Sequence, residues 1–536
     1  MASSLSTCFL CTHSVKSPAL KTPTLTSKTR CFVRLRIRVP PKASSRNNNA
    51  NTDSVEKPSS HEPPRNSTSS LLRRFRKGWL KFDELGMEIM LIALPAALAL
   101  AADPIASLID TAFVGHIGAV ELAAVGVSAS VFNLVSKVFN VPLLNITTSF
   151  VAEEQALIGK EEDLSQSNEN GKDQSKKLLP SVSTSLALAA ALGIAETVAL
   201  SLGSGILMNI MGIPADSPMR GPAEQFLTLR AFGAPPIVIA LAAQGTFRGF
   251  LDTKTPLYAV GAGNFLNAIL DPILIFLFGF GISGAAAATV ISEYLIAFIL
   301  LWKLSGKVLL MPFDFDGGKV FGYLKSGSLL IARTLAVFTT ITLSTSIAAK
   351  QGPIPMAGHQ ICMQVWLSIS LLTDALALAG QALLASSYSQ GNYEQARLVI
   401  YRVIQIGLGA GISLSMILFF GFGAFSSLFS TDSEVLDVAQ TGILFVAGSQ
   451  PVNALAFVID GIYYGVSDFG YAAYSMLLVG LVSSIFLLVA APELGLPGVW
   501  TGLFIFMTLR VLAGVLRLSS KSGPWDTIWY KDGAGD

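Results

Sequence analysis

The chain has 536 residues, of which 51% are hydrophobic and 13% are charged, about half the charged fraction of an ordinary soluble domain. This composition excludes a soluble globular protein and indicates one that lives in a membrane. The formal net charge of +2 is too small to indicate nucleic-acid binding, and the basic residues gather in a leader and in short loops rather than on one face.

The first segment, residues 1–52, contains nine Lys or Arg and no Asp or Glu among many Ser and Thr. This composition is typical of an organelle transit peptide, and the Met-Ala start with late arginines favours a plastid. A merely disordered basic tail is the alternative. Residues 53–80 are expected to be an unstructured spacer with a basic flank. Three of the four cysteines lie in the leader, so the mature protein would keep only Cys362, which excludes internal disulfides and Cys-rich metal sites.

Twelve apolar segments follow, each long enough for a membrane span of roughly 20 residues. The first six lie near 89–112, 122–151, 179–212, 223–247, 256–280 and 282–303. The second six lie near 321–349, 356–388, 398–428, 438–465, 469–492 and 495–518. The sequence therefore predicts an all-α integral membrane protein with twelve transmembrane helices. They form an N-terminal six-helix bundle over 81–305 and a C-terminal one over 306–520, followed by a tail over 521–536.

Basic residues in the loops predict the orientation of these spans, because Lys and Arg resist translocation. Twenty of them lie on the side of the chain termini, and only Arg220 and Lys350 lie on the opposite side. Both termini are therefore expected on the inner side of the membrane, which in a plastid envelope is the stroma.

The two halves of the chain repeat one another. Gly245–Asp252 aligns with Gly461–Asp468, and Pro235 aligns with Pro451 at the same shift along the chain. Gly281–Gly284 aligns with Gly495–Gly498 at nearly that shift. A weaker match upstream has a larger shift, so the first half holds extra residues, and the polar run over 161–177 is the obvious insertion. Six spans in each half predict a parallel repeat whose axis runs along the membrane normal.

Ionisable residues within the spans are informative, because each costs about 2.5–3.5 kcal/mol at the bilayer centre on insertion scales. Each therefore needs a partner, a watery cavity or a function. The candidates are Asp103, Asp110, Glu196, Arg230, Asp271, Glu293, Arg333, Asp374, Asp460 and Arg510.

Spans one and five carry polar faces. In span five, Asn264, Asn267 and Asp271 stand at helical offsets of 0, 3 and 7, which places them on one face. In span one, Asp103 and Asp110 likewise share a face. If the two faces meet, they enclose a pocket in which a desolvated carboxylate can exchange a proton or hold another cation. A static cluster of buried hydrogen bonds is the alternative.

Two prolines, Pro95 and Pro104, lie inside span one and are expected to bend it, because proline removes a backbone donor. We therefore predict a hinge there.

The run Pro104–Gly118, followed by Leu122-Ala-Ala, resembles the first span of multidrug and toxic compound extrusion (MATE) carriers. Gln244–Gly249 and Asn267–Asp271 extend this resemblance, which covers residues 80–518. It implies the MATE fold, with two six-helix bundles in a V, alternating access, and solute export against inward H+ or Na+ flow. It also implies that Asp110, Asn267 and Asp271 carry the coupling ion and that bending of span one transmits the change.

Within that family the sequence resembles the plant DETOXIFICATION group and its branch of citrate exporters and plastid-targeted relatives, through Arg333 and Leu372–Gln381. Other eukaryotic members carry a glutamate in span seven, where this chain has no acid. The resemblance implies a central substrate cavity, and citrate or another organic anion is a possible substrate. The candidate cavity residues are Arg333, Gln360, Gln364, Asp374, Gln381, Asn453 and Asp460. Alternatively, Arg333 and Asp374 neutralise each other as an ion pair.

Other functions fit the sequence less well. The chain lacks the basic motif of major facilitator carriers between spans two and three, the paired aspartates of an intramembrane prenyltransferase, and a GxxxxGK[ST] loop for ATP. A passive channel without ion coupling, or a multispanning enzyme, remains the alternative to a carrier. We expect no cofactor and no metal, and a monomer whose partners are a small-molecule substrate, the coupling ion and the lipid bilayer.

Overall fold

The structure is a computed structural model that describes residues 83–165, 179–211, 213–309, 317–427, 433–520 and 522–530. The predicted transit peptide and the spacer lie outside the described residues, as does most of the predicted insertion. The described residues cover the membrane-embedded part of the chain.

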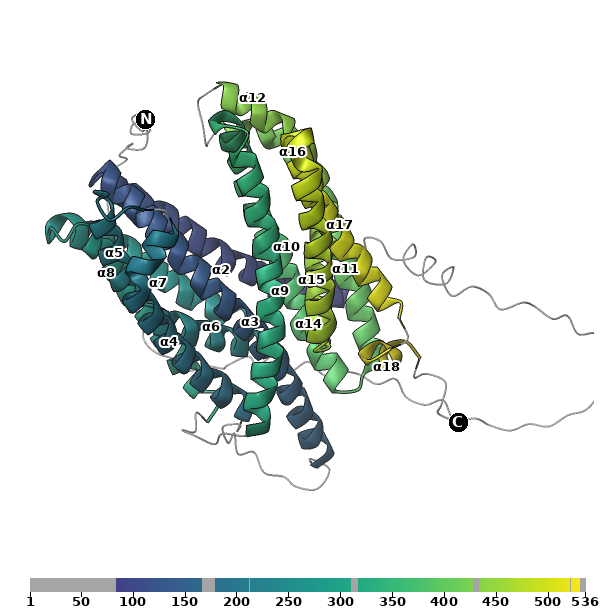
Figure 1. Cartoon of the computed structure of the whole chain (residues 1–536). Helices are drawn as coiled ribbons and strands as arrows, with labels where there is room; N and C mark the ends of the chain where they lie inside the picture. The colour runs from purple at the N-terminus through teal and green to yellow at the C-terminus, as the bar shows by residue number, and fades with distance from the viewer. Residues whose placement is uncertain are drawn as a thin grey trace, which may run out of the picture. The chain divides into compact units, whose positions relative to one another are not determined.

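The described residues of the first half are almost entirely helical (Figure 1). They are α2 (Glu84–Gly115), α3 (Ala119–Ser165), α4 (Pro180–Ile210), α5 (Arg220–Ala231), α6 (Ala234–Gly249), α7 (Lys254–Pro272), the π-helical turn η1 (Ile273–Leu277) and α8 (Ile282–Ser305). Asp83 caps the start of α2, because its side chain accepts a hydrogen bond from the Gly86 amide at 2.9 Å.

The second half has the same kind of organisation. Its helices are α9 (Gly317–Ala349), α10 (Pro353–Ser389), α11 (Tyr393–Ser426), α12 (Ser433–Thr441), α13 (Ile443–Gly448), α14 (Gln450–Gly465), α15 (Phe469–Val489), α16 (Ala491–Leu494) and α17 (Leu496–Leu518). Within the predicted tail, α18 (Pro524–Tyr530) buries Trp525 and Ile528 against the second half.

Each of the twelve predicted spans corresponds to a helix or to a bent pair of helices. Ten helices of the described chain are long and apolar enough to cross a membrane unbroken. The other two predicted spans are broken: α5 and α6 meet at 45°, and Ser433–Gly448 meets α14 at 48°. A proline stands at the second residue of α6 and of α14, Pro235 and Pro451, so the two breaks occupy equivalent positions of the repeat.

The backbone follows the sequence repeat residue by residue. Leu251 and Ser467 are the two non-glycine residues with positive φ in the described chain, at 59° and 57°, and the shift that aligns Pro235 with Pro451 also relates them. Gly281 and Gly495, which the sequence repeat pairs, precede α8 and α17 with φ of 55° and 66°. Because the left-handed region disfavours L side chains, its use at equivalent positions confirms that the two halves share one fold.

Glycines at equivalent positions bring helices close together. A Cβ atom on Gly245 would lie 2.8 Å from the carbonyl oxygen of Leu144, and one on Gly461 would lie 2.3 Å from that of Ala377. Leu144 and Ala377 are themselves related by the larger shift found in the upstream part of the repeat. Helix α6 therefore packs on α3 as α14 packs on α10, with backbones in direct contact.

Replacing Gly461 by Ala is expected to lower the stability of the protein by about 1–3 kcal/mol, because the new methyl group meets backbone that cannot move aside. Gly261 in α7 is the matched control, since nothing lies within 4 Å of a Cβ atom placed there. Thermal unfolding of the purified protein in detergent measures both changes. Equal melting temperatures for the two variants would contradict the close approach.

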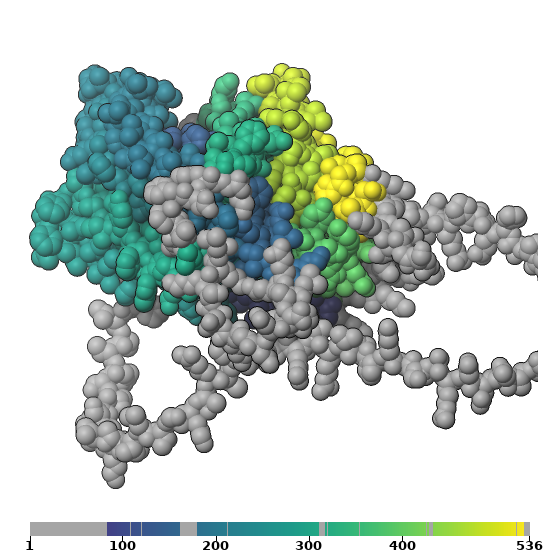
Figure 2. Space-filling model, turned by 90° about the horizontal axis from the view of Figure 1, so that it is seen from below, coloured from purple at the N-terminus to yellow at the C-terminus, as the bar shows by residue number. Residues whose placement is uncertain are grey.

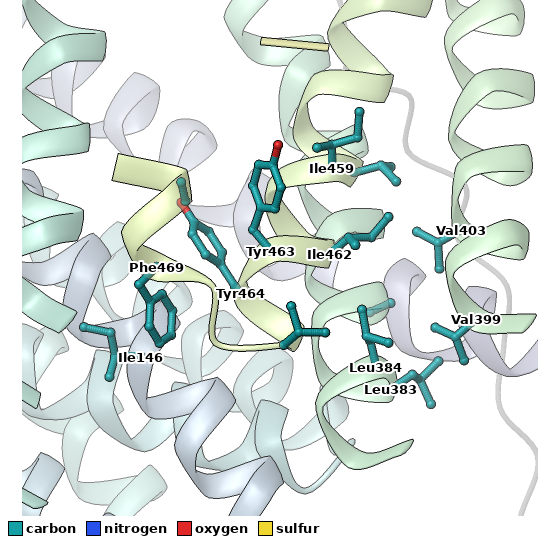
Figure 3. Close-up of a cluster of buried hydrophobic side chains, with 14 of the residues drawn as sticks. Ile146, Leu383, Leu384, Val399, Val403, Ile459, Ile462, Tyr463, Tyr464 and Phe469 are labelled. Atoms are coloured by element: carbon teal, nitrogen blue, oxygen red, sulfur yellow. The ribbon is translucent and has the colours of Figure 1, made fainter. Parts of the chain in front are cut away.

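The helices of the first half (the first group, α2 to α8) contact those of the second half (the second group, α9 to α18). The contact involves α2 and α3 of the first group and α9 and α10 of the second. Figure 2, seen from below, shows the first group in blue and teal beside the second in green and yellow. A cluster of buried side chains joins them, with Ile146 of α3 beside Phe469 of α15 and with Leu383 of α10 in the same cluster (Figure 3).

Hydrogen bonds reinforce this contact. The Gln381 side-chain amide donates to the Asn145 carbonyl oxygen and to the Ser149 hydroxyl, both at 2.9 Å. The Ser149 hydroxyl in turn donates to the Tyr464 carbonyl oxygen at 2.7 Å. These bonds link α3 of the first group to α10 and α14 of the second.

Candidate functional site: a charged cavity lined by both bundles

A cavity of about 900 Å³ is lined by residues of both groups of helices. Most of its wall comes from α2, α3 and α5 to α8, and α9, α10 and α14 contribute the remainder. Its charged lining residues are Asp103, Asp110, Lys137, Arg230, Arg248, Glu293, Arg333, Asp374 and Asp460. The cavity therefore connects the two regions that the sequence analysis singled out.

The polar faces of spans one and five meet, as the sequence predicts. The Asn267 side chain on α7 donates a hydrogen bond to Asp110 Oδ1 on α2 at 2.5 Å. The Asn264 side chain donates to Asp103 Oδ1 at 3.2 Å. Asp103, Asp110, Asn264 and Asn267 all line the cavity, whereas Asp271 lies behind them.

Asp271 is fully buried, and neither of its carboxylate oxygens accepts a hydrogen bond from a described residue. Asp110 is its acidic neighbour, close enough for a carboxyl–carboxyl hydrogen bond once one of the two groups is protonated. Two adjacent carboxyl groups out of water resist being ionised together, so a proton or another cation stabilises the pair.

Arg230 and Glu293 form an ion pair in the wall of the cavity. Arg230 of α5 bonds both carboxylate oxygens of Glu293 on α8, at 2.5 and 2.6 Å. The Arg230 guanidinium also lies 4.4 Å from the ring centre of Phe132. This bidentate pair in the cavity wall leaves neither group as the obvious ligand for a substrate.

Arg333 forms an ion pair with Asp460, so the alternative in which Arg333 and Asp374 neutralise each other as an ion pair is wrong. The same oxygen of Asp460 also receives a bond from Arg510 of α17. One carboxylate on α14 thus holds guanidinium groups from α9 and α17. The sequence could not identify this arrangement, because helical periodicity does not reveal which spans face one another.

Arg248 is one of the twenty basic residues that were expected in loops on the inner side of the membrane. It lies instead in the last turn of α6, is 4% exposed and lines the cavity. Its guanidinium donates no hydrogen bond to any described residue, and Nη1 is fully buried. Asp374 of α10 is the acid that acts on it electrostatically, and among the described residues the Asp374 carboxylate accepts no hydrogen bond and forms no ion pair.

Of the four amide side chains predicted to line the substrate cavity, only Gln381 does so. Gln381 lines the cavity, but its amide nitrogen is used between the bundles. Asn453 is buried away from the cavity and donates to the Ser370 hydroxyl at 2.6 Å. Gln360 and Gln364 are exposed and do not line the cavity. Gln364 precedes Asp374 by almost three helical turns, about 15 Å along a helix, which explains the separation.

The two prolines of span one lie inside α2, which runs through both of them without a break. Pro104 lines the cavity beside Asp103, and Pro95 does not. Their role as a hinge stays a prediction.

Two charged residues of the cavity were not identified as such from the sequence, Lys137 and Arg248. Lys137 stands in the middle of α3 between apolar runs, a signal that was available in the sequence. Arg248 was harder to recognise, because it lies one residue before the end of α6. A basic residue so close to a helix end is usually taken to belong to the loop on the inner side of the membrane.

Comparisons with known proteins agree with this architecture. A family model described as MatE matches residues 164–273 and 330–489. Protein DETOXIFICATION 44, chloroplastic, of Arabidopsis thaliana is 68% identical over 446 residues, which cover 83% of this chain and 84% of that protein. Protein DETOXIFICATION 45, chloroplastic, of the same plant is 49% identical, with 83% and 80% covered.

Solved structures with the same fold include the crystal structures of MATE in the bent and in the straight conformation. Their TM-scores are 0.72 and 0.70 at 21% and 22% identity. Each comparison covers 82% of this chain, and 96% and 97% of the respective solved chains. The repeated six-span halves, the shared cavity and these matches lead to one conclusion: the chain belongs to the MatE family of membrane efflux transporters.

Proposed function

We propose that this transporter exports a small organic solute in exchange for protons, and that Asp110 and Asp271 together carry a coupling proton. Asp271 is the observation that supports this most directly, because it is fully buried without a hydrogen-bond donor and has another acid as its neighbour. Protonation relieves the repulsion within the pair. Since Asn267 binds Asp110 directly, a change in protonation reaches both α2 and α7.

The cavity suits an organic solute with an anionic group. Its volume of about 900 Å³ lies in the range that holds drug-sized molecules. Arg248 offers a guanidinium without a hydrogen-bonded partner, whereas Arg333 is already paired with Asp460. A carboxylate on the solute would give Arg248 the charge-assisted hydrogen bonds that it lacks. Citrate is a reasonable first probe.

We place the protein in the plastid envelope, with both termini in the stroma and residues 1–52 as the transit peptide. The composition of the leader, the loop charges and the chloroplastic names of the relatives support this placement. A fluorescent protein fused behind residues 1–80 tests it, and cytosolic or mitochondrial fluorescence would contradict it.

Transport by the purified full chain in proteoliposomes tests the function. An imposed pH gradient is expected to drive accumulation of radiolabelled citrate, and collapse of the gradient by a protonophore is expected to abolish it. Other carboxylates, phenolic acids and cationic dyes are compared in the same assay. Citrate flux that ignores the gradient would indicate a passive channel and contradict proton exchange.

Replacing Arg248 by Gln is expected to lower citrate uptake about 10- to 100-fold, which corresponds to the loss of one or two charge-assisted hydrogen bonds. Arg248→Lys is the matched control, because it keeps the charge and part of the donor capacity and so retains more of the uptake. Uptake of a cationic dye is expected to change little in either variant. An equal loss for citrate and dye would assign Arg248 to folding rather than to anion binding.

A further inference from the structure

Glu196 is a buried acid that the coupling pair does not use. It lies near the middle of α4, on the first bundle, and is 4% exposed. An ionised carboxylate at the centre of a membrane span is unfavourable unless a cation or a set of donors stabilises it. The groups around Glu196 therefore determine whether its carboxyl group is protonated or ionised.

The polar neighbours of Glu196 are two uncharged side chains of α3. The Ser136 hydroxyl of α3 donates to Glu196 Oε2 at 3.1 Å, and Asn140, one helical turn further along α3, is the other polar neighbour. Glu196 Oε1 and Asn140 Oδ1 are both buried without a hydrogen-bond partner. A single proton on Glu196 turns one of these two acceptors into a donor, which satisfies a buried polar group that otherwise lacks a partner.

Basic groups on the neighbouring helices do not neutralise Glu196. Helix α4 packs against α3, α5, α6 and α9. The in-span cations of these helices act on other acids, namely Lys137 on Asp103, Arg230 on Glu293, Arg248 on Asp374 and Arg333 on Asp460. Ser136 and Asn140 act on the Glu196 carboxyl group, and no basic side chain of the described residues forms an ion pair with it.

The cavity gives this acid a route to protons. Ser136 and Asn140 both line the cavity, and Glu196 lies directly behind them. The Asp110–Asp271 pair is held by α2 and α7, whereas Glu196 is held by α3 and α4. The two acidic sites are thus reached from one cavity through different residues.

We propose that Glu196 is a second proton-exchanging site of the first bundle, which loads and unloads its proton through Ser136 and Asn140. Its part in transport rests on the proposed proton exchange, whereas its protonation does not. In a proton-coupled cycle, Glu196 adds one proton for each solute exported.

Chemical labelling tests the protonation independently of transport. N,N′-dicyclohexylcarbodiimide modifies protonated carboxyl groups in apolar surroundings, and mass spectrometry of the reconstituted full chain locates the adduct. Glu196 is expected to be labelled at acidic pH, with labelling that falls as the pH rises and that Na+ does not prevent. In Ser136→Ala, which removes the hydrogen bond to the charged form, labelling is expected to persist to higher pH. Absent labelling, pH-independent labelling or protection by Na+ at constant pH would each overturn the proposal.

Transport measures the second proton. With the membrane potential clamped at zero, citrate accumulation at equilibrium is expected to fall about tenfold per unit of pH gradient in Glu196→Gln, the loss of one exchanged proton. An unchanged dependence on the gradient would overturn the role in coupling. If the wild-type protein ignores the gradient altogether, the proposed function fails, and the labelling result still decides the protonation of Glu196.

Discussion

Replacing Asp460 by Asn is expected to destabilise the folded protein by about 3–5 kcal/mol, which is the usual effect of removing one partner from a buried ion pair. The reason is that Asp460 is the shared counter-ion of Arg333 and Arg510. The three side chains are only 12%, 12% and 8% exposed. Without the carboxylate, two guanidinium groups remain close together away from bulk water, where their repulsion is weakly screened.

The same change at an exposed ion pair serves as the matched control. Asp252, in the turn between α6 and α7, binds Lys307, which follows the end of α8, at 2.7 Å, and the two side chains are 23% and 48% exposed. Asp252→Asn is expected to cost less than about 1 kcal/mol. Thermal unfolding in detergent and the yield of monodisperse protein compare the two variants. Similar melting temperatures would show that Asp460 is not the counter-ion that holds α9 and α17 together.

The pH at which the control is measured matters. Burial opposes the charged form of Asp252, but hydrogen bonds from Lys307 and from Thr255, with the Lys307 charge, hold its pKa below the ordinary value. A depressed pKa in the folded state adds stability above the ordinary pKa, and this stability is lost as the pH falls through the folded value. At neutral pH the Asp252 pair is therefore fully formed.

Replacing Asp271 by Asn is expected to lower gradient-driven accumulation about tenfold per unit of pH gradient while leaving the fold intact. An amide has the shape of the acid but takes up no proton, and Asp271 has no hydrogen-bonded partner that the change would remove. Each exchanged proton multiplies the accumulation ratio about tenfold per unit of pH gradient, so the loss of this proton lowers it by that factor. Asp110→Asn should behave in the same way, because the two acids form one site.

Citrate accumulation in proteoliposomes measures this effect, with melting temperature as the check on folding. Asp216→Asn is the matched control, since Asp216 is an exposed acid between α4 and α5. It is expected to transport like the unmodified protein. Full-rate, gradient-dependent transport by Asp271→Asn would remove the acid pair from the mechanism.

Much of the fold could be predicted because the two halves of the sequence repeat one another. The shift that aligns Pro235 with Pro451 also relates the two helix breaks and the positive φ angles of Leu251 and Ser467. Apolar length predicted where the spans lie. It did not predict the breaks themselves, because a bent pair has the same composition as a straight span.

The acid-rich part of the site was also predictable, because Asn264, Asn267 and Asp271 share a helix face that is otherwise apolar. The meeting of this face with α2 is observed. The partner of Arg333 and the absence of a hydrogen-bonded partner for Arg248 among the described residues were not predictable. The spans contain several acids that could lie near each arginine. Which of them does so depends on how helices from the two halves of the chain are placed around the cavity.

The hydrogen bonds that Gln381 and Ser149 make between the bundles bias the resting state of the carrier. Each such bond contributes about 0.5–1.5 kcal/mol, so the three favour the joined arrangement by roughly tenfold to a thousandfold. Separating the bundles at α3, α10 and α14 breaks all three. If the carrier exchanges protons as proposed and separates its bundles here, these bonds would slow turnover without cargo and so limit futile leakage of protons down their gradient.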